Sequence, residues 1–329
     1  MSLKEAESIL GLKPHSITQK MKTNNLPYTK DKNKNYFSHT AAKYLYKDIM
    51  GLENFGHAVI AIQIVKGGTG KTALTINLAA RLSLLGFKVL MIDLDQQGNL
   101  TRYCNINSEE SPTMIDILEK GVKIDNSVIE VSDGLFIIPS KIDNALLDDL
   151  ILIKGLSLNV AIKKHIDSIK SNYNFILIDC PPSLGKSVGA AALSSDFIIA
   201  PVTPDEQCLA GLRLLHNGLE DLKDISGNNK SVPYRIVLNQ FELKTIATNK
   251  MVIALDKNEE YRKRLFKTTI KKSQEFKNRC DNKQSIYDSL SQSIAKVDID
   301  FWAQEVITVS KQICSSSIDK PKKRTRKNK

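Results

Sequence analysis

The sequence predicts an α/β fold, a doubly wound and mostly parallel sheet, with a small winged helix-turn-helix domain at the amino terminus. Short apolar runs alternate with helical patterns from residue 58 onward, which is typical of β-α-β units. The chain has 329 residues and 42% hydrophobic content, enough to bury one large core. A separate pattern of two helices joined by a turn occupies the first 50 residues and predicts the added domain.

Six apolar runs predict buried strands, because strands of a parallel sheet are covered on both faces and lack polar alternation. They are Ala58–Val65, Val89–Asp93, Leu135–Pro139, Phe175–Asp179, Phe197–Val202 and Arg235–Asn239. Between the first two runs, leucines recur at helical spacing at positions 74, 78, 82 and 85. Gly86 stands where that helix ends. We therefore expect one doubly wound domain over residues 58–314.

The first 50 residues carry a pattern of their own. Leu3–Leu10 and Ser16–Asn24 are helical stretches joined by a turn that contains Gly11 and Pro14, which is helix-turn-helix spacing. Two short extended segments within residues 26–38, separated by a Lys/Asn turn, predict a β-wing. A closing helix is expected over Ala41–Asp48, which completes a helix-turn-helix domain over residues 1–50.

Basic residues are concentrated at the two ends of the chain. The net charge of +11 divides into +4 for residues 1–57, +1 for residues 58–314 and +6 for residues 315–329. Residues 51–57 are expected to form a linker, and the last 15 residues, which have almost no apolar side chains, a disordered tail. Basic ends fit a polyanion partner, most simply nucleic acid, with a solubilising role for the tail as the alternative.

The cysteines and histidines show no pattern typical of a disulfide framework or a metal site. The five cysteines are scattered and never spaced C-x-x-C, and the five histidines lack metal-ligand spacing. No early apolar run resembles a signal peptide, and no stretch of 18 apolar residues occurs. We therefore expect a cytoplasmic protein.

The most informative segment follows the first predicted strand and opens the first helix of the sheet domain. It is Lys66-Gly67-Gly68-Thr69-Gly70-Lys71-Thr72. Glycines let backbone N–H groups curl around phosphate oxygens, and the helix N-terminus adds a partial positive charge. We expect Lys71 to hold the β- and γ-phosphates of a nucleotide and the Thr72 hydroxyl to bind Mg²⁺. The alternative is a glycine turn with an incidental lysine.

The additional lysine before the glycine pair makes this segment resemble the deviant Walker A motif, K-G-G-x-G-K-T, of the ParA/MinD family of ATPases. Residues 89–99 are similar to the family's second motif, a strand ending in D-x-D followed by P-Q-G-N, although Gln96 replaces the proline. Residues 175–182 look like its Walker B strand. The resemblance spans roughly residues 58–310 and implies a P-loop ATPase fold that binds ATP with Mg²⁺.

The resemblance also implies roles for the acidic residues at the strand ends, where open α/β sheets bind their ligands. Asp179 is expected to hold Mg²⁺ through water, with a helix-capping carboxylate as the alternative. Asp93 is expected to support the metal shell. Asp95 is implied to orient the attacking water, with a solvated loop carboxylate as the alternative. Thr101 is a further candidate for nucleotide binding.

Lys66 resembles the family's signature lysine, which crosses a dimer interface to the γ-phosphate of the other subunit and so makes a homodimer depend on ATP. The alternative is a solvated lysine at a strand end. Asn239 resembles the family's adenine-contacting position, with a turn-forming asparagine as the alternative. No N-K-x-D guanine motif occurs, which favours ATP over GTP.

Two segments are candidates for contact with DNA. Residues 261–283 contain nine Lys or Arg against two acids, and the corresponding region of ParA proteins contacts the DNA backbone. The candidates there are Lys271, Lys272, Lys277 and Arg279, with a solvated helix face as the alternative. In the helix-turn-helix domain the candidates for major-groove contact are Ser16, Thr18, Gln19 and Lys22. A helical hairpin used only for dimerisation is the alternative.

The sequence therefore favours a ParA-like partition ATPase. As an ATP-dependent dimer it would bind DNA nonspecifically, associate with the nucleoid, and segregate a plasmid or chromosome with a ParB-type partner that stimulates slow hydrolysis. The helix-turn-helix adds repression of its own operon, and the alternative is a repressor switched by nucleotide. A MinD-like protein would need an amphipathic carboxyl-terminal helix, for which residues 320–329 are too polar. A nitrogenase iron protein would need cluster-binding cysteines, which these five do not match.

Overall fold

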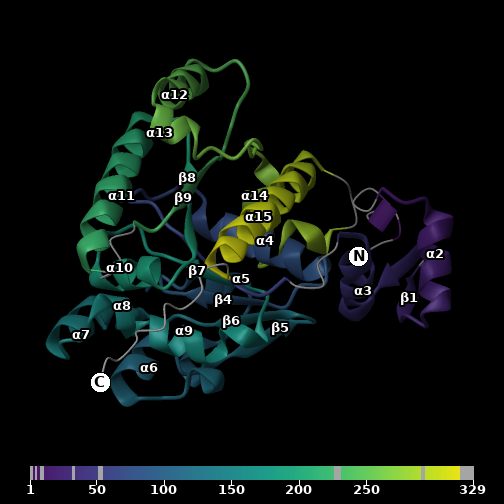
Figure 1. Cartoon of the computed structure of the whole chain (residues 1–329), viewed down its shortest axis with the longest axis horizontal. Coiled ribbons are helices and arrows are strands. Elements are labelled where there is room, and N and C mark those ends of the chain that lie inside the picture. The colour runs from purple at the N-terminus through teal and green to yellow at the C-terminus, as the bar shows by residue number, and fades with distance from the viewer. Residues whose placement is uncertain are drawn as a thin grey trace, which may run out of the picture.

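The computed structural model (Figure 1) describes residues 3, 6–7, 11–31, 34–50, 55–225, 231–289 and 293–318. Most of the described chain forms a main domain, a seven-stranded sheet with helices on both faces. A small amino-terminal module lies at one end of this domain (Figure 1). The predicted first helix, Leu3–Leu10, falls mostly outside the described residues. None of the described helices is long and apolar enough to cross a membrane.

The seven strands have the order β5-β6-β4-β7-β3-β8-β9. They are β3 (Ala58–Ile62), β4 (Val89–Asp93), β5 (Ile129–Ser132), β6 (Leu135–Ile138), β7 (Phe175–Asp179), β8 (Phe197–Val202) and β9 (Tyr234–Leu238). All six predicted runs contain strands, and these pair in parallel. β5 was not predicted; it pairs antiparallel with β6 at the edge of the sheet. The prediction of a doubly wound, mostly parallel sheet is confirmed.

Helices and short 3₁₀ turns connect the strands. The α-helices of the main domain are α4 (Lys71–Leu84), α5 (Asn99–Tyr103), α6 (Met114–Lys120), α7 (Leu147–Ile153), α8 (Leu158–Ala161), α9 (Lys163–Ile169), α10 (Lys186–Leu193), α11 (Glu206–Ile225), α12 (Ile246–Lys257), α13 (Glu259–Arg262), α14 (Gln274–Asp281) and α15 (Ile294–Ile318). The 3₁₀ turns are η2 (Ser108–Glu110), η3 (Ile124–Ser127), η4 (Ile142–Leu146), η5 (Lys170–Asn172) and η6 (Ile286–Asp288). Helix α4 directly follows the predicted phosphate loop, as its leucine spacing indicates.

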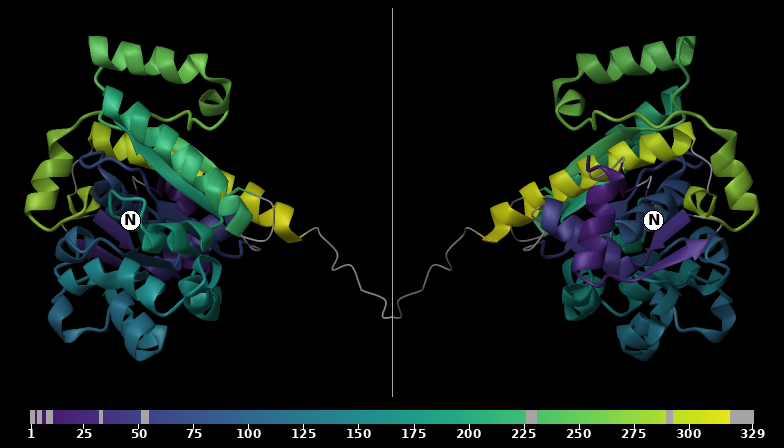
Figure 2. Two further views of the ribbon diagram at one scale, coloured as in Figure 1. Left: turned by 90° about the vertical axis from the view of Figure 1, so that its left-hand side faces the viewer. Right: turned by 90° about the vertical axis from the view of Figure 1, so that its right-hand side faces the viewer.

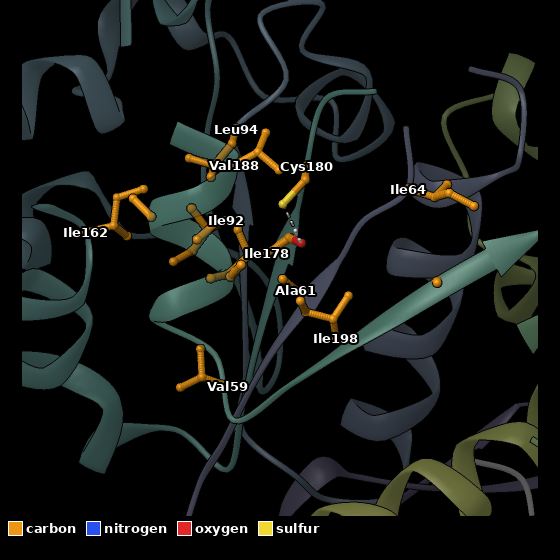
Figure 3. Close-up of a cluster of buried hydrophobic side chains, with 14 of the residues drawn as sticks. Val59, Ala61, Ile64, Ile92, Leu94, Ile162, Ile178, Cys180, Val188 and Ile198 are labelled. Carbon is orange, nitrogen blue, oxygen red and sulfur yellow. Dashed lines mark hydrogen bonds between the residues drawn. The ribbon is translucent and has the colours of Figure 1, made fainter. Parts of the chain in front are cut away.

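The sheet separates two apolar cores, because successive side chains of a strand point to opposite faces. In β3, Ala58, Ile60 and Ile62 face one core, which they share with α4 and α15. Val59 and Ala61 face the other, with Ile178 of β7 and Val188 of α10 (Figure 3). The strands are packed on both faces, so the carboxyl ends of the parallel strands have fixed positions along one edge of the sheet.

The amino-terminal module (residues 11–31 and 34–50) contains the second helix, the hairpin and the closing helix at about their predicted positions. They are α2 (Pro14–Thr23), β1 (Tyr28–Asp31), β2 (Lys34–Phe37) and α3 (His39–Met50). Helix α2 begins at Pro14, which is preorganised for a first helical turn. Ile17 and Met21, one turn apart, are buried on the same side of α2. The module thus builds a small core of its own, which continues into the main domain.

The module packs directly on the main domain through α3. His39 Nε2 lies 3.0 Å from the carbonyl oxygen of Phe87, and the His39 N–H donates to Asp133. The backbone of Lys43 lies against Gly86, where an added Cβ would come within 2.1 Å of Lys43 Cα. These contacts are made by residues just before β4 and β6, so the module sits at the amino-terminal edge of the sheet.

Both predicted boundary segments differ partly from expectation. In the predicted linker, residues 55–57 are described, and the Phe55 ring lies 4.9 Å from that of Phe175, so this part packs on the sheet domain. At the carboxyl end, α15 continues through residues 315–318, because the preceding turns of that helix are anchored by Trp302 and Val306 in the core. The rest of the predicted disordered tail, residues 319–329, lies outside the described residues.

Candidate phosphate-binding site

The loop between β3 and α4 has the backbone shape that the glycines predict. Gly68 and Gly70 adopt φ angles of +76° and +83°, in the left-handed region that favours glycine. A Cβ on Gly70 would also come within 2.5 Å of the Asn239 side-chain nitrogen. The loop leads straight into α4, whose N-terminus provides backbone N–H groups and a partial positive charge. This arrangement fits an anionic phosphate.

Lys71 is held inside the loop that it belongs to. Its side chain is buried, and Nζ donates to the carbonyl oxygen of Lys66 at 2.9 Å. Burial lowers the pKa of Lys71, and the nearby Asp179 carboxylate opposes this shift. An ammonium in a polar loop is thereby positioned where the predicted phosphates would lie.

Asp179, at the carboxyl end of β7, faces the first turn of α4. Its carboxylate accepts hydrogen bonds from the Thr72 hydroxyl at 2.7 Å and from the Thr75 hydroxyl at 3.2 Å. Burial raises its pKa to about 7, although the two hydroxyls and Lys71 lower it. The structure therefore brings together Thr72 and Asp179, both predicted for Mg²⁺, and adds Thr75, which was not predicted.

Asp93 and Asp179 are neighbours on adjacent strands, β4 and β7, in the same register. Burial, and then the Asp179 carboxylate, raise the pKa of Asp93 to about 8. The Thr101 hydroxyl and N–H both donate to Asp93, at 2.7 and 2.9 Å. Thr101 is buried and orients Asp93, and its predicted contact with the nucleotide stays a prediction.

Asp95 follows two residues later, where the chain turns away from the sheet. Its carboxylate accepts from the Gln97 N–H at 3.0 Å, and its backbone oxygen accepts from the Ser140 hydroxyl at 2.7 Å. Ser140 in turn bonds Asn144 at 2.8 Å. Ser140 and Asn144 were not predicted. Their only sequence signal is that Ser140 follows the strand run ending at Pro139, which places it at the same edge of the sheet.

The Mg²⁺ prediction can be tested against these donors. Thr72, Asp93 and Asp179 offer hard oxygen atoms, which Mg²⁺ prefers. Among the described residues no group of three or more His, Cys, Asp or Glu side chains is arranged to hold a metal alone. Mg²⁺ in nucleotide sites is bound by one or two carboxylates together with substrate phosphates, so this donor set fits an ion that arrives with the nucleotide.

Asn239, which directly follows β9, forms a hydrogen bond with the backbone of the phosphate loop. Its side-chain nitrogen donates to the Thr69 carbonyl oxygen at 2.8 Å, and the side chain is buried. Gln240 donates similarly to the Gly68 oxygen at 3.0 Å. Asn239 thus positions the phosphate loop, and its predicted contact with adenine stays a prediction.

A cavity of about 420 Å³ opens beside the loop and has the size of a nucleoside site. Its lining includes Lys66, Pro204, Gln240, Glu242, Thr245 and Lys272.

Lys66 lies at the mouth of this cavity. Its ammonium donates to the Gln207 side-chain oxygen and lies 3.9 Å from an oxygen of Asp205. About a quarter of the Lys66 side chain is exposed. In this single chain the signature lysine therefore pairs with acceptors that precede and begin α11.

The predicted DNA-contact residues of the main domain divide into two groups. Lys271 pairs with Asp298 at 2.7 Å, and Lys272 pairs with Glu242 at 2.7 Å. Lys277 is exposed on α14, and Arg279 donates to the Gln284 side chain at 2.7 Å. Acids from other segments offset the charges of the first two, and Lys277 and Arg279 share α14 with Glu275 and Asp281, so the four candidates alone do not make a strongly basic surface.

The four candidates on α2 also differ in their surroundings. Ser16, Gln19 and Lys22 are exposed and recur every three residues, on the side opposite the buried Ile17 and Met21. Thr18 is partly buried, and its hydroxyl donates to the Pro14 carbonyl at 2.9 Å. Thus three of the four form one accessible face.

Comparison with known proteins agrees with this site. A family described as an AAA domain matches residues 57–232. The sporulation initiation inhibitor protein Soj of Bacillus subtilis is 37% identical over 161 residues, 48% of this chain and 63% of that protein. The chromosome-partitioning ATPase Soj of Treponema pallidum is 39% identical over 156 residues, 46% of this chain and 58% of that protein. The chain thus spans less than two thirds of these relatives' own length.

Among solved structures, a plasmid partition protein of Borrelia burgdorferi bound to AMPPNP superposes with a TM-score of 0.64 and 25% identity. The superposition covers 78% of this chain and 99% of that one. That solved structure contains AMPPNP, an ATP analogue, which agrees with the predicted use of ATP.

Proposed function

This chain belongs to the ParA family of partition ATPases, and from that membership we propose that it hydrolyses ATP slowly and uses ATP to switch between a monomer and a DNA-binding dimer. ATP with Mg²⁺ is its cofactor pair. The observation that carries the proposal is the group formed by Lys71, Thr72 and Asp179 around a glycine loop, with Lys66 at its mouth.

Each residue of the site has its own role in ATP hydrolysis. Lys71 and the N–H groups of the loop bind the phosphates, and Thr72 with Asp179 would hold Mg²⁺, which offsets charge on the β- and γ-phosphates when bound. Asp93, fixed by Thr101, supports that metal shell. Asp95 orients the attacking water from a turn held by Ser140. Asp93 and Asp179 are assigned to the metal, which leaves Asp95 as the candidate general base, and we expect hydrolysis to be slow until a partner stimulates it.

Lys66 links nucleotide binding to dimerisation. In the dimer it leaves Gln207 and Asp205 and reaches the γ-phosphate bound by the partner subunit, as the family's signature lysine does. An exposed ion pair of this kind is worth about 0–1 kcal/mol, so a charged phosphate competes for Lys66 easily. ADP lacks the γ-phosphate and leaves Lys66 on its own chain.

We further propose that the ATP dimer binds DNA nonspecifically on the nucleoid and segregates a plasmid or chromosome. The support is the basic excess of residues 261–283, nine Lys or Arg against two acids, of which Arg262, Lys267 and Lys277 are exposed. A ParB-type partner would release the protein by stimulating hydrolysis. The exposed face of α2 supports a second role, binding an operator and repressing the protein's own operon.

Binding to random-sequence duplex DNA tests this proposal. It is measured with ATP, ADP and no nucleotide across a salt series, with Lys71→Ala and Lys66→Ala as variants. Lys123→Ala is the charge-matched control, because Lys123 is exposed on the face of the sheet domain opposite α4. We expect binding with ATP only, weakening with salt, lost in the two loop variants and kept in the control. Binding that ignores nucleotide and both loop lysines contradicts it.

A repressor switched by nucleotide is the second candidate function, and the docked module favours it. In that case sequence-specific operator binding persists in Lys66→Ala, and nonspecific binding is absent in every nucleotide state.

A further inference from the structure

The phosphate loop and the amino-terminal module lie at opposite edges of the sheet. The loop follows the carboxyl end of β3, and α4 leads away from it for 14 residues. At 1.5 Å per residue this helix is about 21 Å long. The module contacts the last turns of α4 at Arg81, and Gly86 and Phe87 just after that helix. The module therefore lies at the end of α4 that is distant from the phosphate loop.

The module is packed in one orientation and is not held by a tether alone. Ala41, Ala42 and Leu45 of α3 belong to the same buried cluster as α4 and α15. Tyr46 is buried near Arg81 of α4, whose Nε lies 2.8 Å from Asp300 of α15. Movement of the module would expose this apolar surface and the buried Arg81, at a cost in free energy.

The exposed face of α2 points away from the main domain. α3 lies between the main domain and α2 (Figure 1), and in the right-hand view of Figure 2 the module faces the viewer. Ile17 and Met21 point into the module, so Ser16, Gln19 and Lys22 are on its outer side. The described part of α2 has basic residues in its last turn and no acid in its first, which suits a DNA backbone.

We propose that the ATP-bound dimer bridges two separate DNA duplexes, one on each amino-terminal module. This inference rests on the proposed function, because the dimer forms across the face where Lys66 lies. The two modules are then at the outer ends, and their α2 faces point in opposite directions. The combined length of the two α4 helices is about 42 Å. Helix-turn-helix dimers that read one palindrome hold their recognition helices on one side, about 34 Å apart.

A capture experiment tests the bridge. A random-sequence duplex is fixed to beads, and recovery of a second, fluorescent duplex is measured with full-length protein and AMPPNP. We expect recovery with the wild type and with Lys123→Ala. Lys66→Ala should recover no second duplex, because it forms no dimer with AMPPNP. Loss of recovery in Gln19→Ala/Lys22→Ala supports the proposal, and full recovery in that variant overturns it, since another surface would then form the bridge.

The distance between modules gives an independent test. A spin label is placed at the exposed Thr23 through an unnatural amino acid, and the distance between labels is measured in the AMPPNP complex without DNA. We expect a separation beyond about 50 Å, from two α4 lengths and the nucleotide sites. A dimer with a separation near about 34 Å overturns the bridge and leaves the ATP switch intact. Failure of AMPPNP to produce a dimer, seen by sedimentation, overturns the proposed function itself.

Discussion

Replacing Gly86 by alanine should loosen the amino-terminal module from the main domain. Gly86 ends α4 with a φ of +87°, and an added Cβ would lie 2.1 Å from both the nitrogen and Cα of Lys43. Both atoms belong to the backbone of α3, so no side-chain rotation relieves the clash. Either α4 or the whole module has to move.

The cost can be estimated by comparison with Gly121. This glycine ends α6 with a φ of +69°, and a Cβ added to it would meet no atom within 4 Å, so Gly121→Ala introduces backbone strain alone. Such strain costs about 1–2 kcal/mol. Gly86→Ala adds overpacking of about 1–3 kcal/mol. We expect a loss of unfolding free energy of about 2–5 kcal/mol for Gly86→Ala and about 1–2 kcal/mol for Gly121→Ala.

Chemical denaturation of the two full-length variants measures this difference, and limited proteolysis reports whether the module has separated. We expect Gly86→Ala alone to release an amino-terminal fragment faster than the wild type. Equal destabilisation of the two variants with unchanged proteolysis would show that α3 does not press on Gly86, and the docked arrangement would be refuted.

Three further predictions concern the nucleotide site. Thr72→Ala should weaken Mg²⁺ affinity by about 10–100-fold in a titration of ATP binding, and Thr72→Ser should restore it. Equal Mg²⁺ affinity in the two variants would show that the hydroxyl is not a ligand of the ion. Gln207→Ala should raise the dimer fraction at limiting ATP by up to about tenfold, since it frees Lys66 from a hydrogen bond worth about 0.5–1.5 kcal/mol, and sedimentation at graded ATP measures this. A lower fraction would contradict it. Burial raises the pKa of Asp179 to about 7 and of Asp93 to about 8, whereas unfolding returns both to about 4. The folded protein therefore binds more protons, and without ligand its stability should fall as pH rises from about 5 to 8. Thermal melting across pH checks this, and Asp179→Asn should flatten the profile; an unchanged slope in that variant would count against the assignment.

The sheet was predictable because its strands are buried on both faces. β7 and β8 contain apolar side chains almost throughout, so their composition alone predicts a strand. β5 escaped prediction because it pairs on one side only and its burial alternates between partly buried and exposed residues. An edge strand of four residues leaves a weak signal.

The phosphate loop and its acidic partners were predictable, and the residues that position them were not. Lys71 and Asp179 carry motif signals, and the structure places them together. Thr101 and Asn239 were predicted at the site, but their hydrogen bonds to Asp93 and Thr69 were not, because tertiary contacts bring these partners together. Ser140 lies on a separate loop and has no motif. Contacts between distant segments decide such roles, and no local pattern contains them.

The mass of the protein in solution with each nucleotide tests the central claim most directly. Sedimentation of the full-length wild type and of Lys66→Ala is measured with Mg²⁺ and either AMPPNP or ADP. We predict a wild-type dimer with AMPPNP, a monomer with ADP, and a monomer in both states for Lys66→Ala. The same mass in every state, or a Lys66→Ala variant that still dimerises with AMPPNP, would contradict the account.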